Sequence, residues 1–71
     1  METRKEFEQK LPQRIEVVKK EVQEGDFINY RPNLVRVQKV LEKGVQIKGP
    51  YGETQVMDWE DVVEYNRDLW N

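Results

Sequence analysis

The first third of the chain carries apolar residues at helical spacing. Five of them recur at steps of four, four, three and four: Phe7, Leu11, Ile15, Val18 and Val22. Most residues between them are charged or carry an amide, so the pattern predicts one apolar stripe on an amphipathic helix. Thr3 followed by Glu6 has the spacing of a capping box, which marks the start of that helix.

Pro12 interrupts this stripe. Proline lacks an N–H donor and disfavours helical geometry in the residue before it, but it is tolerated in a first helical turn. The sequence therefore predicts a kinked or split helix, with two pieces over about 3–10 and 12–22. In an alternative interpretation residues 15–19 are extended, because Ile15 and Val17 also alternate with charged residues.

After Gly25 the pattern changes to short runs rich in valine, isoleucine, tyrosine and tryptophan, separated by turns. Such runs predict strands over 27–30, 34–41, 45–48, 54–57 and 62–65. Asp58 is expected to cap a single helical turn before the last of them. Short, closely spaced strands are typical of a small barrel or sandwich.

The loop 42–44 is expected to join the second and third strands as a hairpin. A three-residue loop ending in glycine suits a type I turn followed by a left-handed residue, here Gly44. This register pairs Leu41 with Val45. It also places Lys39 on the core face, and a bulge at or beside Lys39 would remove that conflict.

The runs 25–30, 37–47 around Lys43-Gly44, and 59–63 resemble an SH3-like barrel of the KOW or Tudor-like type. The resemblance implies a barrel that binds proteins or nucleic acids, and it transfers no functional residue. The expected fold is mainly β with an N-terminal helix: a helical segment over 1–24, a five-stranded barrel over 25–65 and a tail over 66–71, all in one domain.

Composition narrows the class of protein. The 71 residues include no cysteine and no histidine, and no apolar run approaches the length of a membrane span. We expect a small soluble domain of the cytoplasm. The net charge is −2, but residues 31–48 carry a local charge of +4 and residues 53–68 a local charge of −5, so the domain is expected to be electrically two-sided.

Catalytic chemistry has little support in this composition. The chain has no serine, cysteine or histidine, and its only threonines are Thr3 and Thr54, which excludes the usual nucleophile and base pairs. The glycines occupy turn positions rather than a phosphate-binding loop. Asp58, Glu60 and Asp61 are interpreted as a solvated acidic turn. We therefore expect no enzyme, no cofactor, no metal and no small-molecule substrate.

One candidate surface is basic and aromatic, and would bind nucleic acid. Its residues are Arg31, Arg36, Lys39, Lys43, Lys48, Tyr30 and Tyr51. Strand alternation sends Arg36, Gln46 and Lys48 outward, and an aromatic ring beside a cation can stack on a base next to a phosphate. The simpler interpretation is solvated charge with Tyr30 in the core. A less favoured one makes Tyr51, Trp59 and Tyr65 an aromatic cage.

The other candidate surface is apolar and lies at the two chain ends. Its residues are Phe7, Leu11, Ile15, Val18, Leu69 and Trp70. They either pack on one another, with the helix closing one end of the barrel, or remain exposed as an anchor for a partner or a homodimer. The leading functional hypothesis is a non-catalytic module that binds a protein partner. The alternative hypothesis is a nucleic-acid-binding barrel that uses the basic hairpin over 31–48.

Overall fold

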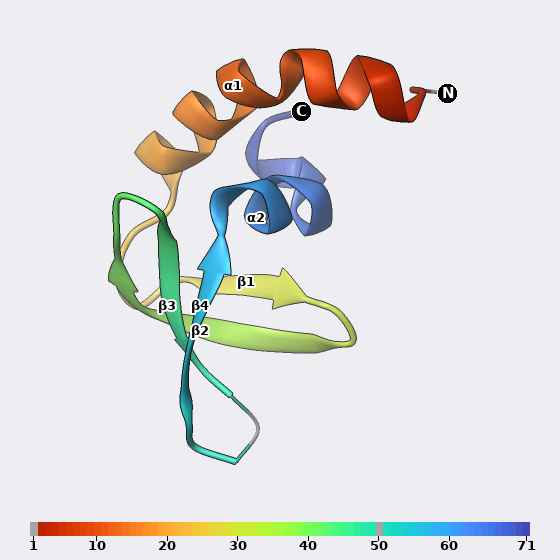
Figure 1. The fold of residues 1–71 in the computed structure, drawn as a ribbon. Coiled ribbons are helices and arrows are strands. Elements are labelled where there is room, and N and C mark those ends of the chain that lie inside the picture. The colour runs from red at the N-terminus through yellow and green to blue at the C-terminus, as the bar shows by residue number, and fades with distance from the viewer. Residues whose placement is uncertain (1, 50) are drawn as a thin grey trace.

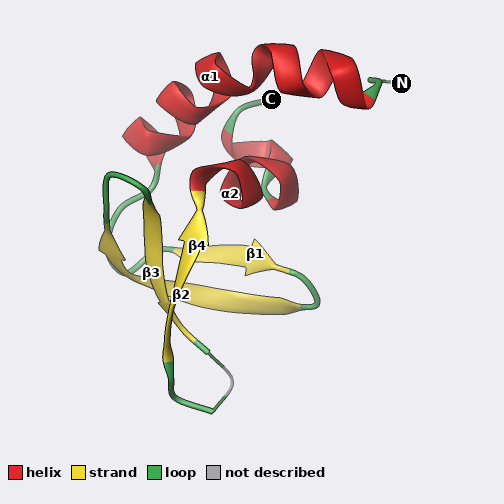
Figure 2. Ribbon diagram, in the orientation of Figure 1, coloured by secondary structure: helices red, strands yellow, loops and turns green. Residues whose placement is uncertain are grey.

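The computed structural model describes residues 2–49 and 51–71. Its elements follow in the order α1 (Arg4–Glu21), β1 (Phe27–Tyr30), β2 (Asn33–Val40), β3 (Gly44–Lys48), β4 (Thr54–Asp58), α2 (Trp59–Tyr65) and the 3-10 turn η1 (Arg67–Leu69). The four strands form an antiparallel meander in the order β1-β2-β3-β4. Both helices lie on one side of this sheet, with α2 between the sheet and α1 (Figures 1 and 2).

Helix α1 begins where the capping signal places it. The hydroxyl oxygen of Thr3 accepts the backbone N–H of Glu6 at 3.2 Å. Pro12 lies inside this helix, so the predicted split is wrong, as is the alternative that residues 15–19 are extended. The helix ribbon turns gently near its middle (Figure 1). Proline costs the helix one hydrogen bond and some strain, and the apolar stripe packed below the helix on both sides of Pro12 outweighs that cost.

The β2–β3 hairpin contains the predicted bulge, because its register shifts between Val37 and Lys39. The prediction of a left-handed Gly44 after a three-residue loop is wrong. Gly44 is the first residue of β3, has no positive φ, and pairs with Leu41 through hydrogen bonds of 2.8 and 3.4 Å. Glycine is needed there because a Cβ would collide with the carbonyl oxygen of Met57 on the neighbouring strand.

The predicted fifth strand over 62–65 is wrong, because this segment belongs to α2. Trp59, Val62 and Val63 are all buried, and a spacing of three and then one also fits one face of a helix. Asp58 precedes the helix with an extended backbone and occupies its N-cap position. With four strands, and with no contact between β1 and β4 among the described residues, the sheet stays open and the five-stranded barrel is not formed.

The core lies between the inner face of the sheet and the two helices. It comprises Phe7, Val18, Val22, Ile28, Val37, Val45, Ile47, Met57, Trp59, Val62 and Val63. The segment after α2 is folded as well, since η1 contacts α1 and the Trp70 indole N–H donates to the carbonyl of Val63 at 2.7 Å. No helix in the described part of the chain has the length and apolar character needed to cross a bilayer.

Candidate functional site: the outer face of the sheet

The side of the sheet that faces away from α2 is covered by no other element in the described structure. Strand alternation decides which residues lie there, and cross-strand partners share a face. Phe27 is opposite Arg36, and Gln46 is opposite both Lys39 and Val56. We call this surface the outer face: Phe27, Leu34, Arg36, Gln38, Lys39, Gln46, Lys48 and Val56.

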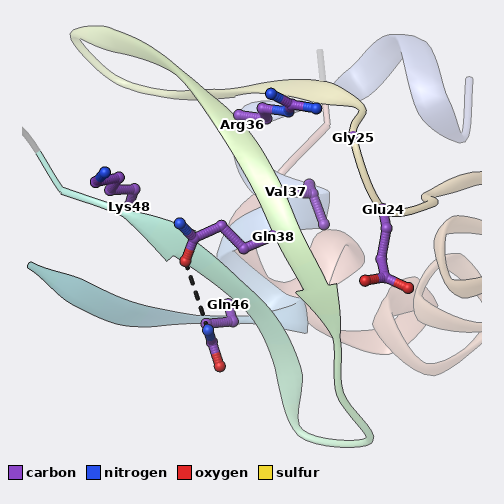
Figure 3. Close-up of a pocket in the computed structure, with 7 residues that line it drawn as sticks. All are labelled: Glu24, Gly25, Arg36, Val37, Gln38, Gln46 and Lys48. Atoms are coloured by element: carbon purple, nitrogen blue, oxygen red, sulfur yellow. Dashed lines mark hydrogen bonds between the residues drawn. The ribbon is translucent and has the colours of Figure 1, made fainter. Parts of the chain in front are cut away.

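A shallow groove of about 720 Å³ crosses the outer face where the bulge bends β2. It is lined by Glu24, Gly25, Arg36, Val37, Gln38, Gln46 and Lys48 (Figure 3). The Gln46 side-chain amide donates to Gln38 Oε1 at 3.5 Å, and Glu24 lies across β2 from Lys48 (Figure 3). The groove therefore offers two cations, two amides and one carboxylate to a ligand that lies along the sheet.

The cations of the outer face form no ion pair with a described carboxylate. Every ion pair between described residues involves a cation of α1, and none includes Arg36, Lys39 or Lys48 within 4.0 Å. The sequence places these three cations outward on alternation alone, and the structure brings them onto one continuous surface. Their positive potential is therefore available to a ligand.

Apolar side chains are exposed beside these cations. Phe27 and Leu34 are each 64% exposed, and Val56 is 44% exposed. Neither surface predicted from the sequence includes Phe27. The register of β1 with β2 could have identified Phe27 as a binding residue, because it pairs Phe27 with Arg36. Aromatic residues and arginine are both common in binding sites.

The other residues of the predicted nucleic-acid surface do not join this cluster. Tyr30 turns inward and packs against Tyr65, with ring centroids 6.0 Å apart. Arg31 follows β1 and lines a separate cleft of about 170 Å³. Lys43 lies in the β2–β3 loop, and Tyr51 is 94% exposed in the β3–β4 turn.

The predicted aromatic cage is not formed. Trp59 is buried, and its indole N–H donates to the carbonyl of Glu42 at 2.9 Å. Tyr65 packs on Tyr30, while Tyr51 projects from a turn. Trp59 is thus a core residue.

The apolar residues at the chain ends pack on one another. Phe7 and Val18 are buried, and the four partly buried members of this set lie against the same core: Leu11, Ile15, Leu69 and Trp70. The interpretation of these side chains as an exposed anchor is wrong, and their intramolecular packing is confirmed. Helix α1 covers α2 and η1, and does not close a barrel end.

Electrostatics on the helix side are internal to the fold. Arg14 donates two hydrogen bonds of 2.6 Å to the carboxylate of Glu2, and its guanidinium lies 3.8 Å from the ring centroid of Trp70. These hydrogen bonds lower the pKa of Glu2. Burial raises the pKa of Asp61, and the nearby negative charges add to that rise.

Among residues 2–49 and 51–71, no group of three or more acidic side chains is arranged to hold a metal ion. Comparisons with protein-family models, curated proteins and solved structures find no match to this chain.

Proposed function

We propose that this chain is a small non-catalytic interaction module that binds a protein partner through the outer face of its sheet. One observation carries the proposal. Arg36, Lys39 and Lys48 form no ion pair with a described carboxylate within 4.0 Å, and they share an uncovered sheet face with exposed apolar side chains. Aromatic residues and arginine are enriched where proteins bind one another.

Two features favour a protein over a polyanion. Glu24 lines the groove together with the cations, and a carboxylate there opposes a phosphate chain but accepts a hydrogen-bond donor from a polypeptide. Leu34 and Val56 are aliphatic, so they add apolar contact area without offering a stacking surface for bases. The net charge of −2 also gives no general attraction to nucleic acid.

Nucleic-acid binding is the second candidate function, and one observation favours it. Phe27 is the cross-strand partner of Arg36 on the outer face, so an aromatic and a cationic residue are direct neighbours there. A base stacked on Phe27 would place its phosphate near Arg36, Lys39 or Lys48. The candidate differs from the leading proposal in its salt dependence, because counterion release makes phosphate-driven binding fall steeply as salt rises.

Site-specific photo-crosslinking tests the proposal. A photoreactive residue replaces Leu34 on the outer face in one variant and Glu16, which is exposed on α1, in the matched control. Both variants are irradiated in an extract of the source cells. Proteins captured only from position 34 are purified and titrated with the wild-type chain and with Arg36→Glu. We expect binding to the wild type and at least tenfold weaker binding to R36E.

Three results contradict the proposal: equal capture from both positions, capture from neither, or binding that R36E leaves unchanged. Titration with labelled single-stranded and duplex oligonucleotides at low and moderate salt completes the test. Oligonucleotide binding that is lost in R36E and falls steeply with salt would establish the second candidate in place of the first.

A further inference from the structure

The two edge strands of the sheet, β1 and β4, differ in whether their outward backbone groups are hydrogen-bonded. At the β1 edge, the Asn66 side chain accepts the backbone N–H of Asn29 at 2.7 Å and donates to the carbonyl of Asn29 at 3.0 Å. Those are the two groups that a neighbouring strand would bond. At the β4 edge, no described residue outside β3 forms a hydrogen bond with the backbone of residues 54–57.

The hydrogen-bond alternation identifies which β4 groups are free. The Gly49 N–H donates to the carbonyl of Glu53 at 2.7 Å, which makes that pair a hydrogen-bonded one. Hydrogen-bonded and non-hydrogen-bonded pairs alternate along an antiparallel ladder. The backbone groups of Gln55 and Met57 therefore point to β3, and those of Thr54 and Val56 point away from it.

Strand β4 has few of the features that usually protect an edge. It contains no proline and no lysine, its one charged residue, Asp58, is the last of the strand, and its register with β3 runs without a bulge from Thr54 to Asp58. Charged side chains, prolines and bulges are the common means by which proteins keep other strands from pairing with an edge. The outward side chain in the middle of this strand is Val56, which is 44% exposed. The edge is thus open, straight and apolar at its centre.

We propose that β4 binds an extended segment of the partner as a fifth strand of the sheet, an inference that rests on the protein-binding function proposed above. Main-chain hydrogen bonds to Thr54 and Val56 would supply affinity, and the side chains on the outer face would supply specificity. The occupant is an extended, acidic segment with an apolar residue at its centre.

The neighbouring strands define that chemistry. An apolar side chain of the added strand meets Val56, its direct neighbour on the outer face. Lys48 is the cross-strand partner of Thr54, so it lies two strand spacings, roughly 10 Å, from the added strand. A lysine side chain extended over the small Thr54 reaches a carboxylate at that position. Lys48 thus complements an acidic segment.

Peptide selection against the full chain tests this inference. A displayed library of random decapeptides is selected on the wild-type protein, and the enriched peptides are synthesised and titrated. We expect enriched peptides with apolar residues flanked by acidic ones at alternating positions. Val56→Pro removes the outward N–H without removing a bond to β3, and we expect it to weaken binding at least tenfold. The matched control Val56→Thr keeps the N–H and should bind within threefold of the wild type.

Amide hydrogen exchange provides a second measurement that does not depend on the folding of V56P. Saturation of the wild type with an enriched peptide should slow exchange of the Thr54 and Val56 amides at least tenfold. The Gln55 and Met57 amides already bond to β3 and should change less. Lys48→Glu should weaken the binding of acidic peptides and leave the exchange pattern of the free protein unchanged.

The remaining outcomes overturn the inference in distinguishable ways. If K48E loses the peptides but V56P binds them normally and the β4 amides stay unprotected, strand addition is wrong and the outer-face function stands. If the peptides instead protect amides of α1, both proposals fail. Failure to enrich any peptide rejects strand addition. Concentration-dependent protection of β4 in the protein alone would make the occupant a second copy of this chain.

Discussion

The helix side of the molecule, formed by α1, α2 and η1, and the outer face of its sheet both carry arginine and phenylalanine. The two regions differ in whether these residues are paired and how far they are exposed. On the helix side, Arg4 pairs with Glu8, Glu60 and Glu64. On the outer face, Arg36 has no described carboxylate within 4.0 Å. The same contrast holds for aromatic residues, since Phe7 is 8% exposed and Phe27 is 64% exposed.

This difference separates what stabilises the fold from what is available to a partner. On the helix side, Arg4 and Arg14 are paired with carboxylates and the apolar stripe packs against the core, so a second molecule would have to break existing contacts to use these groups. The outer face leaves both kinds of group in water, and a partner gains the full interaction with them.

Truncation of a side chain should lower the free energy of unfolding strongly on the core side of the sheet and hardly at all on its outer face. Met57 is fully buried, and Met57→Ala should lower the free energy of unfolding by about 3 kcal/mol, through lost burial and the cavity that remains. Leu34→Ala on the outer face should change it by less than about 0.5 kcal/mol. Urea denaturation of both variants measures the two values. Similar losses would mean that the outer face belongs to the core.

The β1 edge should open when its side-chain cover is removed. The Asn66 side chain makes three hydrogen bonds, to the N–H and carbonyl of Asn29 and to the carbonyl of Val62. Asn66→Ala leaves these groups without partners and should cost about 2 kcal/mol of unfolding free energy. Hydrogen exchange should accelerate at the Asn29 amide more than at the β3 amides. A uniform acceleration would show that Asn66 acts only on global stability.

The Glu2–Arg14 pair makes stability depend on pH in the acid range. Its hydrogen bonds lower the pKa of Glu2 below the ordinary value of 4.5, so the folded state holds this proton more weakly than the unfolded state. The stabilisation by this pair is complete at pH values above the ordinary pKa. It is lost as the pH falls through the lowered pKa of Glu2 in the folded state. In thermal melts from pH 6 to pH 3, Glu2→Gln should reduce the acid loss of stability. Identical pH profiles for wild type and E2Q would rule out this contribution.

The smallest effect is expected on the outer face itself. Because Arg36, Lys39 and Lys48 pair with no described carboxylate, replacing all three with glutamine should change the unfolding free energy by less than about 0.5 kcal/mol. Arg4→Gln, which removes three ion pairs on the helix side, is the matched comparison and should cost more. A larger loss in the triple variant would reveal a structural role for these cations.

Local signals in the sequence identified much of the fold. The Thr3 cap, the four strands of the sheet and the bulge near Lys39 follow from alternation, turn residues and spacing within a few positions. The outward placement of Arg36 and Lys48 follows from the same alternation. Each of these features depends on neighbours along the chain, which is why a single sequence suffices to find them.

The errors lie where distant contacts decide between two local options. Residues 62–65 fit a strand or a helix, and the packing of Val62 and Val63 beneath α1 selects the helix. The sequence around Gly44 fits a left-handed turn residue. In the fold, glycine is required at this position because a Cβ would collide with the Met57 carbonyl oxygen. Asn66 carries no local signal for its bond to Asn29, because 37 residues separate the two.

By itself, the sequence determined the periodicities of this protein: an apolar helical stripe, alternating strands with cations on their outer side, and the residues at which they start and turn. Only the tertiary structure decided which of these surfaces is covered by intramolecular packing. Packing of α1 on α2 and η1 covers the stripe and pairs Arg4 with Glu60 and Glu64, while no other element covers the outer face or the β4 edge. The physical reason is that periodicity defines a face, but burial requires a second element to meet it.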